Sequence, residues 1–172
     1  MNFQFYLEKL INAEEFQKFK KENPNAYLCS GFFSIDKEKE DNHQQHLDYY
    51  VPELEKMFSF KLLKEEKVEM LPIESFNSSE EKKIPNKIND NYDFDFKDIE
   101  KMVDGKMFDE KINKKVLKLL FSLQNQEGKD HLIGTIFISG LGMLKCSIDL
   151  QEKKVVEFEK KSFFDMMKIV KK

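Results

Sequence analysis

A faint internal repeat at a spacing of 88 residues is the feature that most limits how this chain can fold. Several residues recur at that one offset, and the surrounding apolar pattern recurs with them: Phe33-Ser34 and Phe121-Ser122, His43 and His131, Ser59 and Ser147, Leu62 and Leu150. Two copies of one supersecondary unit would fill the 172 residues almost completely. The spacing therefore predicts a doubled architecture.

Each half reads as one helix followed by four strands. Apolar residues at three- and four-residue steps predict helices over residues 6–21 and 96–112, and alternating patterns predict the strands. The expected strands are residues 27–35, 44–51, 57–63 and 68–73 in the first half, and 116–123, 132–139, 143–150 and 155–158 in the second. Short turns join successive strands, which favours antiparallel neighbours. Ser162 is a plausible cap for a final helix over residues 163–170.

The predicted fold class is therefore α+β: a tandem, pseudo-symmetric repeat of a helix and a four-stranded antiparallel meander, with an extra C-terminal helix. We expect the first repeat in residues 1–76, a polar linker in residues 77–92, and the second repeat with the final helix in residues 93–172. The two repeats are expected to share one core. This element order resembles that of small inhibitor proteins, PepSY-type modules and the TATA-binding protein, with no family motif among the residues.

Charge excludes several classes of partner. All 29 basic residues are lysine, the net charge is −3 and the pI is near 5.8. Arginine is the usual residue for bidentate contacts to phosphate and guanine. We therefore expect no nucleic-acid or membrane partner. The start of the chain has no uninterrupted apolar stretch, which favours a cytoplasmic location. Cys29 and Cys146 are then expected to be buried free thiols rather than a disulfide.

The two halves differ on one strand face. In the second repeat that face is apolar, with Leu132, Gly134, Ile136 and Ile138, whereas in the first repeat it holds Gln44, His46, Asp48 and Tyr50. Tyrosine and histidine beside hydrogen-bonding groups suit protein interfaces. This contrast favours a non-enzymatic binding module that recognises a protein partner through a sheet face or loops. The alternative is that this part of the sheet is simply solvated.

Two other functions are weighed against a binding module. Asp41, His43, His46 and Asp48 have the chemistry of divalent-metal ligands, which would suit a small-ligand or metal-dependent enzyme. Alternation along a strand, however, separates the first two from the last two. A saddle that binds nucleic acid is the second alternative, opposed by the charge.

The remaining candidate motifs favour structural roles. Ser139-Gly140-Leu141-Gly142 lies between two strands and predicts a hairpin turn rather than a phosphate loop. Asp95, within an acidic stretch, is expected to cap a helix. Since no catalytic set or cofactor motif is visible, the sequence favours a protein that is not an enzyme and has no cofactor. It leaves monomer and homodimer open.

Overall fold

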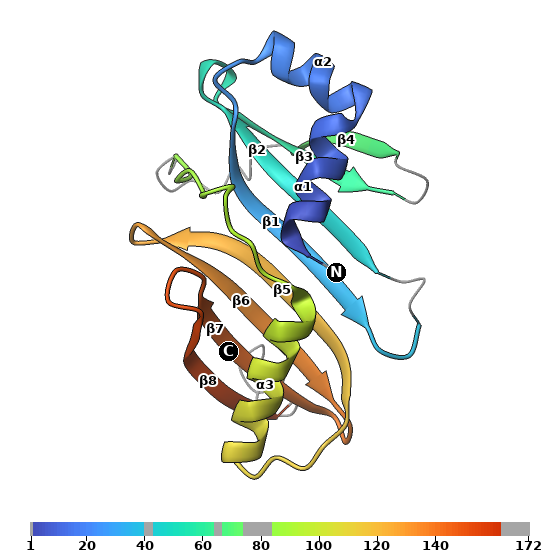
Figure 1. Ribbon diagram of the computed structural model, residues 1–172, viewed down its shortest axis with the longest axis vertical. Helices are drawn as coiled ribbons and strands as arrows, with labels where there is room; N and C mark the ends of the chain where they lie inside the picture. Colours follow the sequence, from blue (N-terminus) through green and yellow to red (C-terminus); the bar gives the residue numbers. More distant parts are fainter. Residues whose placement is uncertain (1, 40–42, 64–66, 74–83, 163–172) are drawn as a thin grey trace, which may run out of the picture.

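The computed structural model describes residues 2–39, 43–63, 67–73 and 84–162. Their strands form one eight-stranded antiparallel sheet in the order β4-β3-β2-β1-β5-β6-β7-β8, and the three α-helices of the described residues lie on one face of it (Figure 1). The first half contributes α1 (Phe3–Asn12), α2 (Glu14–Glu22), β1 (Tyr27–Asp36), β2 (Gln44–Val51), η2 (Pro52–Leu54), β3 (Lys56–Leu62) and β4 (Val68–Ile73). The second half contributes α3 (Phe96–Asp109), β5 (Val116–Gln126), β6 (Lys129–Ile138), β7 (Gly142–Asp149) and β8 (Lys154–Ser162). The α+β class and the antiparallel strands are confirmed.

The first half has two helices where one was predicted. Ala13 is extended, with φ −73° and ψ 134°, and separates α1 from α2. At about 100° per residue, a continuous helix would place Phe16 on the side opposite to Leu7. Both side chains are buried, so the break at Ala13 lets each helix direct its own apolar stripe at the sheet. The prediction of a single helix over residues 6–21 was wrong for this reason.

Helix α3 covers the second half. The side chain of Asp95 accepts a hydrogen bond from the Lys97 N–H at 2.8 Å, which confirms the predicted N-cap. Ile99, Val103 and Met107 are buried against the sheet. The helix continues through Gly105 and ends at Asp109, three residues before the predicted end at 112.

The two halves are joined through β1 and β5. These strands pair antiparallel from Ser30 opposite Gln124 to Asp36 opposite Lys118. Phe33 lies directly opposite Phe121, and the ring of Phe96 contacts both, with centroids 4.8 and 6.1 Å away. One hydrophobic core therefore continues from the first half into the second.

A β-bulge at the start of β1 changes which face Tyr27 occupies. The β1–β2 register shifts between Leu28 and Ser30, which leaves Cys29 as the extra residue. Tyr27 consequently pairs with Tyr50 on the face away from the helices, whereas Phe33 points towards them. The simple alternation expected over residues 27–35, with Tyr27 and Phe33 on one face, was wrong at this point.

The Ser139–Gly142 segment forms the predicted hairpin turn. Ser139, Gly140 and Leu141 connect the paired residues Ile138 and Gly142, and Gly140 and Leu141 have the positive φ values, 79° and 56°, that tight hairpin turns use. The predicted helix over residues 163–170 lies outside the described residues.

Candidate functional site

The four predicted binding residues lie together on the helix-free face of the sheet, which we define as the face opposite α1, α2 and α3. The neighbouring Tyr49 packs on Phe16 and Phe19 of α2, so the residues that alternate with it along β2 point away from the helices. These residues are Gln44, His46, Asp48 and Tyr50. Gln44 is exposed, His46 and Asp48 are half-buried, and Tyr50 is only 7% exposed.

Tyr50 is buried within this surface and offers little of its side chain to a partner. Its ring packs on Tyr27 across the strand pair, with centroids 5.6 Å apart. The accessible part of the predicted site is therefore formed by Gln44, His46 and Asp48. That these residues bind a partner remains a prediction.

Asp48 is tied into β1 by two contacts. Its carboxylate accepts a hydrogen bond from the Ser30 hydroxyl, and its backbone carbonyl accepts one from the Cys29 thiol at 3.3 Å. The other carboxylate oxygen, Oδ1, is buried without a hydrogen-bond partner among the described residues. A buried acceptor of this kind is costly unless a donor reaches it.

His46 has an environment that favours the neutral ring. Its Nδ1 lies 3.4 Å from the Ser59 hydroxyl, and the Phe32 ring packs edge-on against it at 5.0 Å. Burial lowers the pKa of His46, Asp48 opposes that effect, and Lys61 on the adjacent strand adds to it. A neutral imidazole can both donate and accept a hydrogen bond, which suits recognition of polar groups.

Polar side chains continue from this site across the centre of the sheet. Five residues on adjacent strands occupy matching register positions on the helix-free face, and we call them the polar row: Ser59, Asp48, Ser30, Gln124 and His131. At its far end, His131 Nδ1 lies 3.0 Å from the Ser147 hydroxyl. The sequence could not predict this row, because it depends on β1 pairing with β5.

A cavity of about 850 Å³ opens at the β6 end of the polar row. Gln124 and His131 line it together with the β5–β6 turn and residues 84–86. The Tyr27 hydroxyl donates a hydrogen bond to the Pro85 carbonyl at 2.8 Å, and the Ile88 N–H donates one to the Leu28 carbonyl at 2.9 Å. Ile88 is fully buried. Part of the predicted polar linker thus packs on the core and forms one wall of the cavity.

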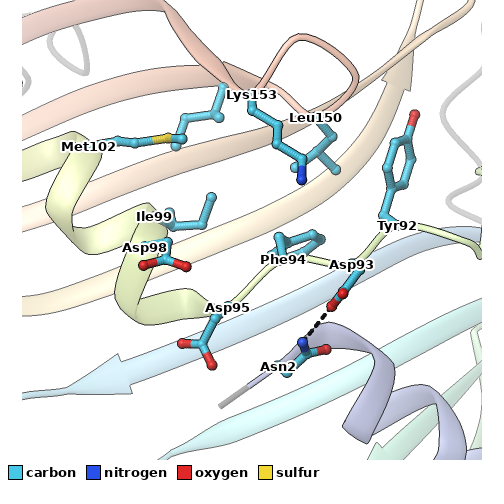
Figure 2. A pocket seen from close by; sticks show the side chains of 11 residues that line it. Asn2, Tyr92, Asp93, Phe94, Asp95, Asp98, Ile99, Met102, Leu150 and Lys153 are labelled. Carbon is cyan, nitrogen blue, oxygen red and sulfur yellow. Dashed lines mark hydrogen bonds between the residues drawn. The ribbon is translucent and has the colours of Figure 1, made fainter.

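A second cavity, of about 240 Å³, lies at the start of α3 on the helix side (Figure 2). Phe94, Ile99, Met102 and Leu150 give it an apolar lining, and the carboxylates of Asp93, Asp95 and Asp98 stand around it. Asn2 donates a hydrogen bond to Asp93 at 2.5 Å, which ties the start of α1 to this region.

The predicted metal cluster is not assembled in the described part of the chain. Asp41 lies outside the described residues, and His43, which precedes β2, has its Nε2 3.1 Å from the Asp36 carbonyl oxygen. No group of three or more histidine, cysteine, aspartate or glutamate side chains within the described ranges could hold a metal ion.

Both cysteines are buried free thiols. Burial raises the pKa of Cys29 to about 12 and that of Cys146 to about 11. The thiolate needed for nucleophilic chemistry is therefore scarce at neutral pH.

Comparison with known proteins places the fold but not the function. No family model and no curated protein matches the chain. A crystal structure from Clostridium difficile 630, described as that of a "putative lipoprotein", matches with a TM-score of 0.55 and 13% identity, over 86% of this chain and 91% of that one. At this identity the likeness shows a shared fold alone. Among the described helices, none is long and apolar enough to span a membrane.

Proposed function

We propose that the protein is a non-enzymatic binding module that recognises a protein partner through the helix-free face of its sheet. The observation that carries this proposal is the polar row, which brings hydrogen-bonding groups from five adjacent strands and both halves onto one surface. Mixed polar and aromatic surfaces of this kind are typical of interfaces that form between separately folded proteins.

The balance of charge on this face supports a protein partner over nucleic acid. Lys61 pairs with His46 on one side and with Glu69 on the other, and Asp48 lies two residues from His46 on the same face of β2. Positive and negative groups are therefore mixed on this part of the face. Such a mixture lacks the excess of positive charge that phosphate backbones require. The large cavity at the end of the row supplies a recess for a side chain of the partner. We also retain the cytoplasmic location as part of this proposal.

We further propose that the two halves are copies of one unit related by an approximate twofold axis through the β1–β5 pair. Phe33 and Phe121, which differ by 88 positions, face each other there. On the next strands, Leu47 lies opposite Gly31 and Ile136 lies opposite Leu119, an offset of 136 − 47 = 89. The offset therefore changes at the first hairpin, as expected when a loop has gained or lost a residue. An experimental structure in which residues 27–73 and 116–162 do not superpose would contradict the repeat.

The binding proposal is tested by affinity capture from the native cell followed by direct measurement with the captured protein. The double variant Gln44→Arg, His46→Arg adds bulk and charge to the helix-free face. Ile11→Arg, at a position 51% exposed on α1, is the matched control on the helix side. We expect wild type and the control to retain a partner that the double variant loses.

Isothermal titration with the purified partner then gives the affinities. A loss of at least about tenfold in the double variant alone supports the proposal. Equal affinities for all three proteins, or loss only with Ile11→Arg, would contradict it.

A further inference from the structure

The two edges of the sheet have different chemistry. Edge strand β8 (Lys154–Ser162) carries five charged residues among nine, and charges of this kind protect an edge from pairing with another strand. Edge strand β4 (Val68–Ile73) carries one, Glu69. Two of its apolar side chains, Met70 and Leu71, are 42% and 47% exposed. The β4 edge therefore lacks the charge protection that the β8 edge has.

The ladder between β3 and β4 determines which backbone groups of β4 point outward. The Leu63 N–H donates to the Lys67 carbonyl at 2.8 Å, and these residues continue the β3–β4 register. Since hydrogen-bonded pairs alternate with non-bonded pairs in an antiparallel ladder, Glu69, Leu71 and Ile73 bond inward to β3. Val68, Met70 and Pro72 then direct their backbone groups away from the sheet.

Pro72 fits this assignment because it has no N–H to give to β3. Its position on the outer side of an edge strand costs the sheet no hydrogen bond. The outward groups of β4 are thus two donors, at Val68 and Met70, and the three carbonyls of Val68, Met70 and Pro72. Within β4, Pro72 removes one outward donor out of a possible three.

We propose that β4 pairs antiparallel with β4 of a second copy of this chain, centred on Met70. In this register Met70 lies opposite Met70 of the partner subunit, and Val68 lies opposite Pro72 of the partner subunit. The Met70 N–H donates to Met70 of the partner subunit, and the Val68 N–H donates to Pro72 of the partner subunit. Every outward donor of both strands finds an acceptor, and the missing N–H of proline leaves no donor unpaired.

The side chains favour a second copy as the occupant. The pairing covers Met70 and Leu71 of both subunits at once, and it sets Leu71 beside Glu69 of the partner subunit without placing like charges opposite each other. A twofold axis perpendicular to the sheet keeps the helices of both subunits on the same side. The two helix-free faces then adjoin as one continuous surface, although the pairing does not depend on the binding function proposed above.

Sedimentation equilibrium of the full chain tests the proposal. We expect a concentration-dependent mass of twice the 20.5 kDa of one chain. Leu71→Glu places a carboxylate opposite Glu69 of the partner subunit, and Met70→Pro removes an outward N–H without removing a bond to β3. Each variant should weaken association at least about tenfold. Val156→Glu, at a position 43% exposed on β8, is the matched control and should associate as wild type does.

Hydrogen exchange provides a second readout that does not depend on the variants alone. The Val68 and Met70 amides should be protected in wild type and in Val156→Glu at high concentration, and should exchange freely in Leu71→Glu, whose fold circular dichroism verifies. Three results would overturn the proposal: a monomer at all concentrations, a dimer that the β4 variants leave intact, or protection of these amides in a monomer. Affinity capture with the monomeric variant Leu71→Glu tests the binding function separately. A monomer that still captures a partner shows that the dimer and the binding function are independent.

Discussion

The two halves each contribute four strands to the sheet and helical cover to the same face of it, but they do so with different side chains. In the first half, rings from α2, β2 and β3 pack on one another, with Phe16, Phe19, Tyr49 and Phe60 at centroid distances of 4.9–6.5 Å. In the second half, the core below α3 is mainly aliphatic, with Leu123, Leu132, Ile136, Leu144 and Ile148. Large rings fill the space beneath two short helices, and branched aliphatic residues fill the space beneath one longer helix. The comparison shows that strand order does not require one type of core.

The largest expected effect comes from truncating one central core residue in each half, which compares the stability that the aromatic and the aliphatic core contribute. Phe60→Ala removes a fully buried ring that contacts Phe16, Phe19 and Tyr49. We expect a loss of about 3–5 kcal/mol in the free energy of unfolding, measured by urea denaturation. Leu144→Ala, also fully buried, should cost about 2–5 kcal/mol and less than the first variant. An equal or larger loss in the free energy of unfolding for Leu144→Ala would show that the aromatic cluster stabilises the protein no more than the aliphatic core does.

Close packing in the second half predicts the next largest effect. A Cβ at Gly134 would lie 2.5 Å from the Cys146 sulfur and 2.9 Å from the Phe121 ring. Gly134→Ala should therefore destabilise the protein by about 1–3 kcal/mol. The double variant Gly134→Ala, Cys146→Ala should recover part of this loss, and no recovery would contradict the proposed crowding at Cys146.

Gly105 provides the opposite case within the same half. It lies inside α3, and a Cβ there would have no heavy atom within 4 Å. Gly105→Ala should raise the free energy of unfolding by about 0.5–1 kcal/mol, because alanine loses less backbone entropy in a helix. A loss of thermal stability in calorimetry would contradict this reading of the helix.

The smallest expected effect concerns the pH dependence contributed by His46 on the helix-free face. Because its pKa is lowered in the folded state, the unfolded chain binds more protons below about pH 6.5. Its contribution to stability is therefore complete above that pH and is lost as the pH falls through the folded pKa. The urea midpoint of His46→Gln should fall less between pH 7.5 and pH 5.5 than that of wild type. Parallel pH profiles would remove His46 as the cause.

The sequence predicted the elements well where the pattern is local. Strand β2 and strand β4 have the predicted limits, and the turn at Gly140 and the cap at Asp95 follow from residue preferences that neighbours cannot easily override. The break at Ala13 was missed because alanine carries no signal for a helix end. It becomes necessary only when the stripes on either side of it must face the same sheet.

The candidate site could be predicted only within one half. The alternation along β2 correctly placed Gln44, His46, Asp48 and Tyr50 on a common face. The contrast with the second half was wrong, because Leu132, Gly134 and Ile136 pair with residues of β5 that point towards the helices, on the opposite face of the sheet. The neighbours Gln124 and His131 could not be found, because the sequence does not say which strands of the two halves meet. The low exposure of Tyr50 depends likewise on the bulge at Cys29, which brings Tyr27 against it.

The ladder between β1 and β5 has a consequence for the folding kinetics. Each hairpin joins strands that are close in the chain, whereas Phe33 and Phe121 are 88 residues apart, about half of the 172-residue chain. Closing so long a loop loses chain entropy before the contacts between the two strands can stabilise the pairing, so ladders of this kind form slowly. We therefore expect each meander to assemble early, with the zipping of β1 onto β5 as the rate-limiting event.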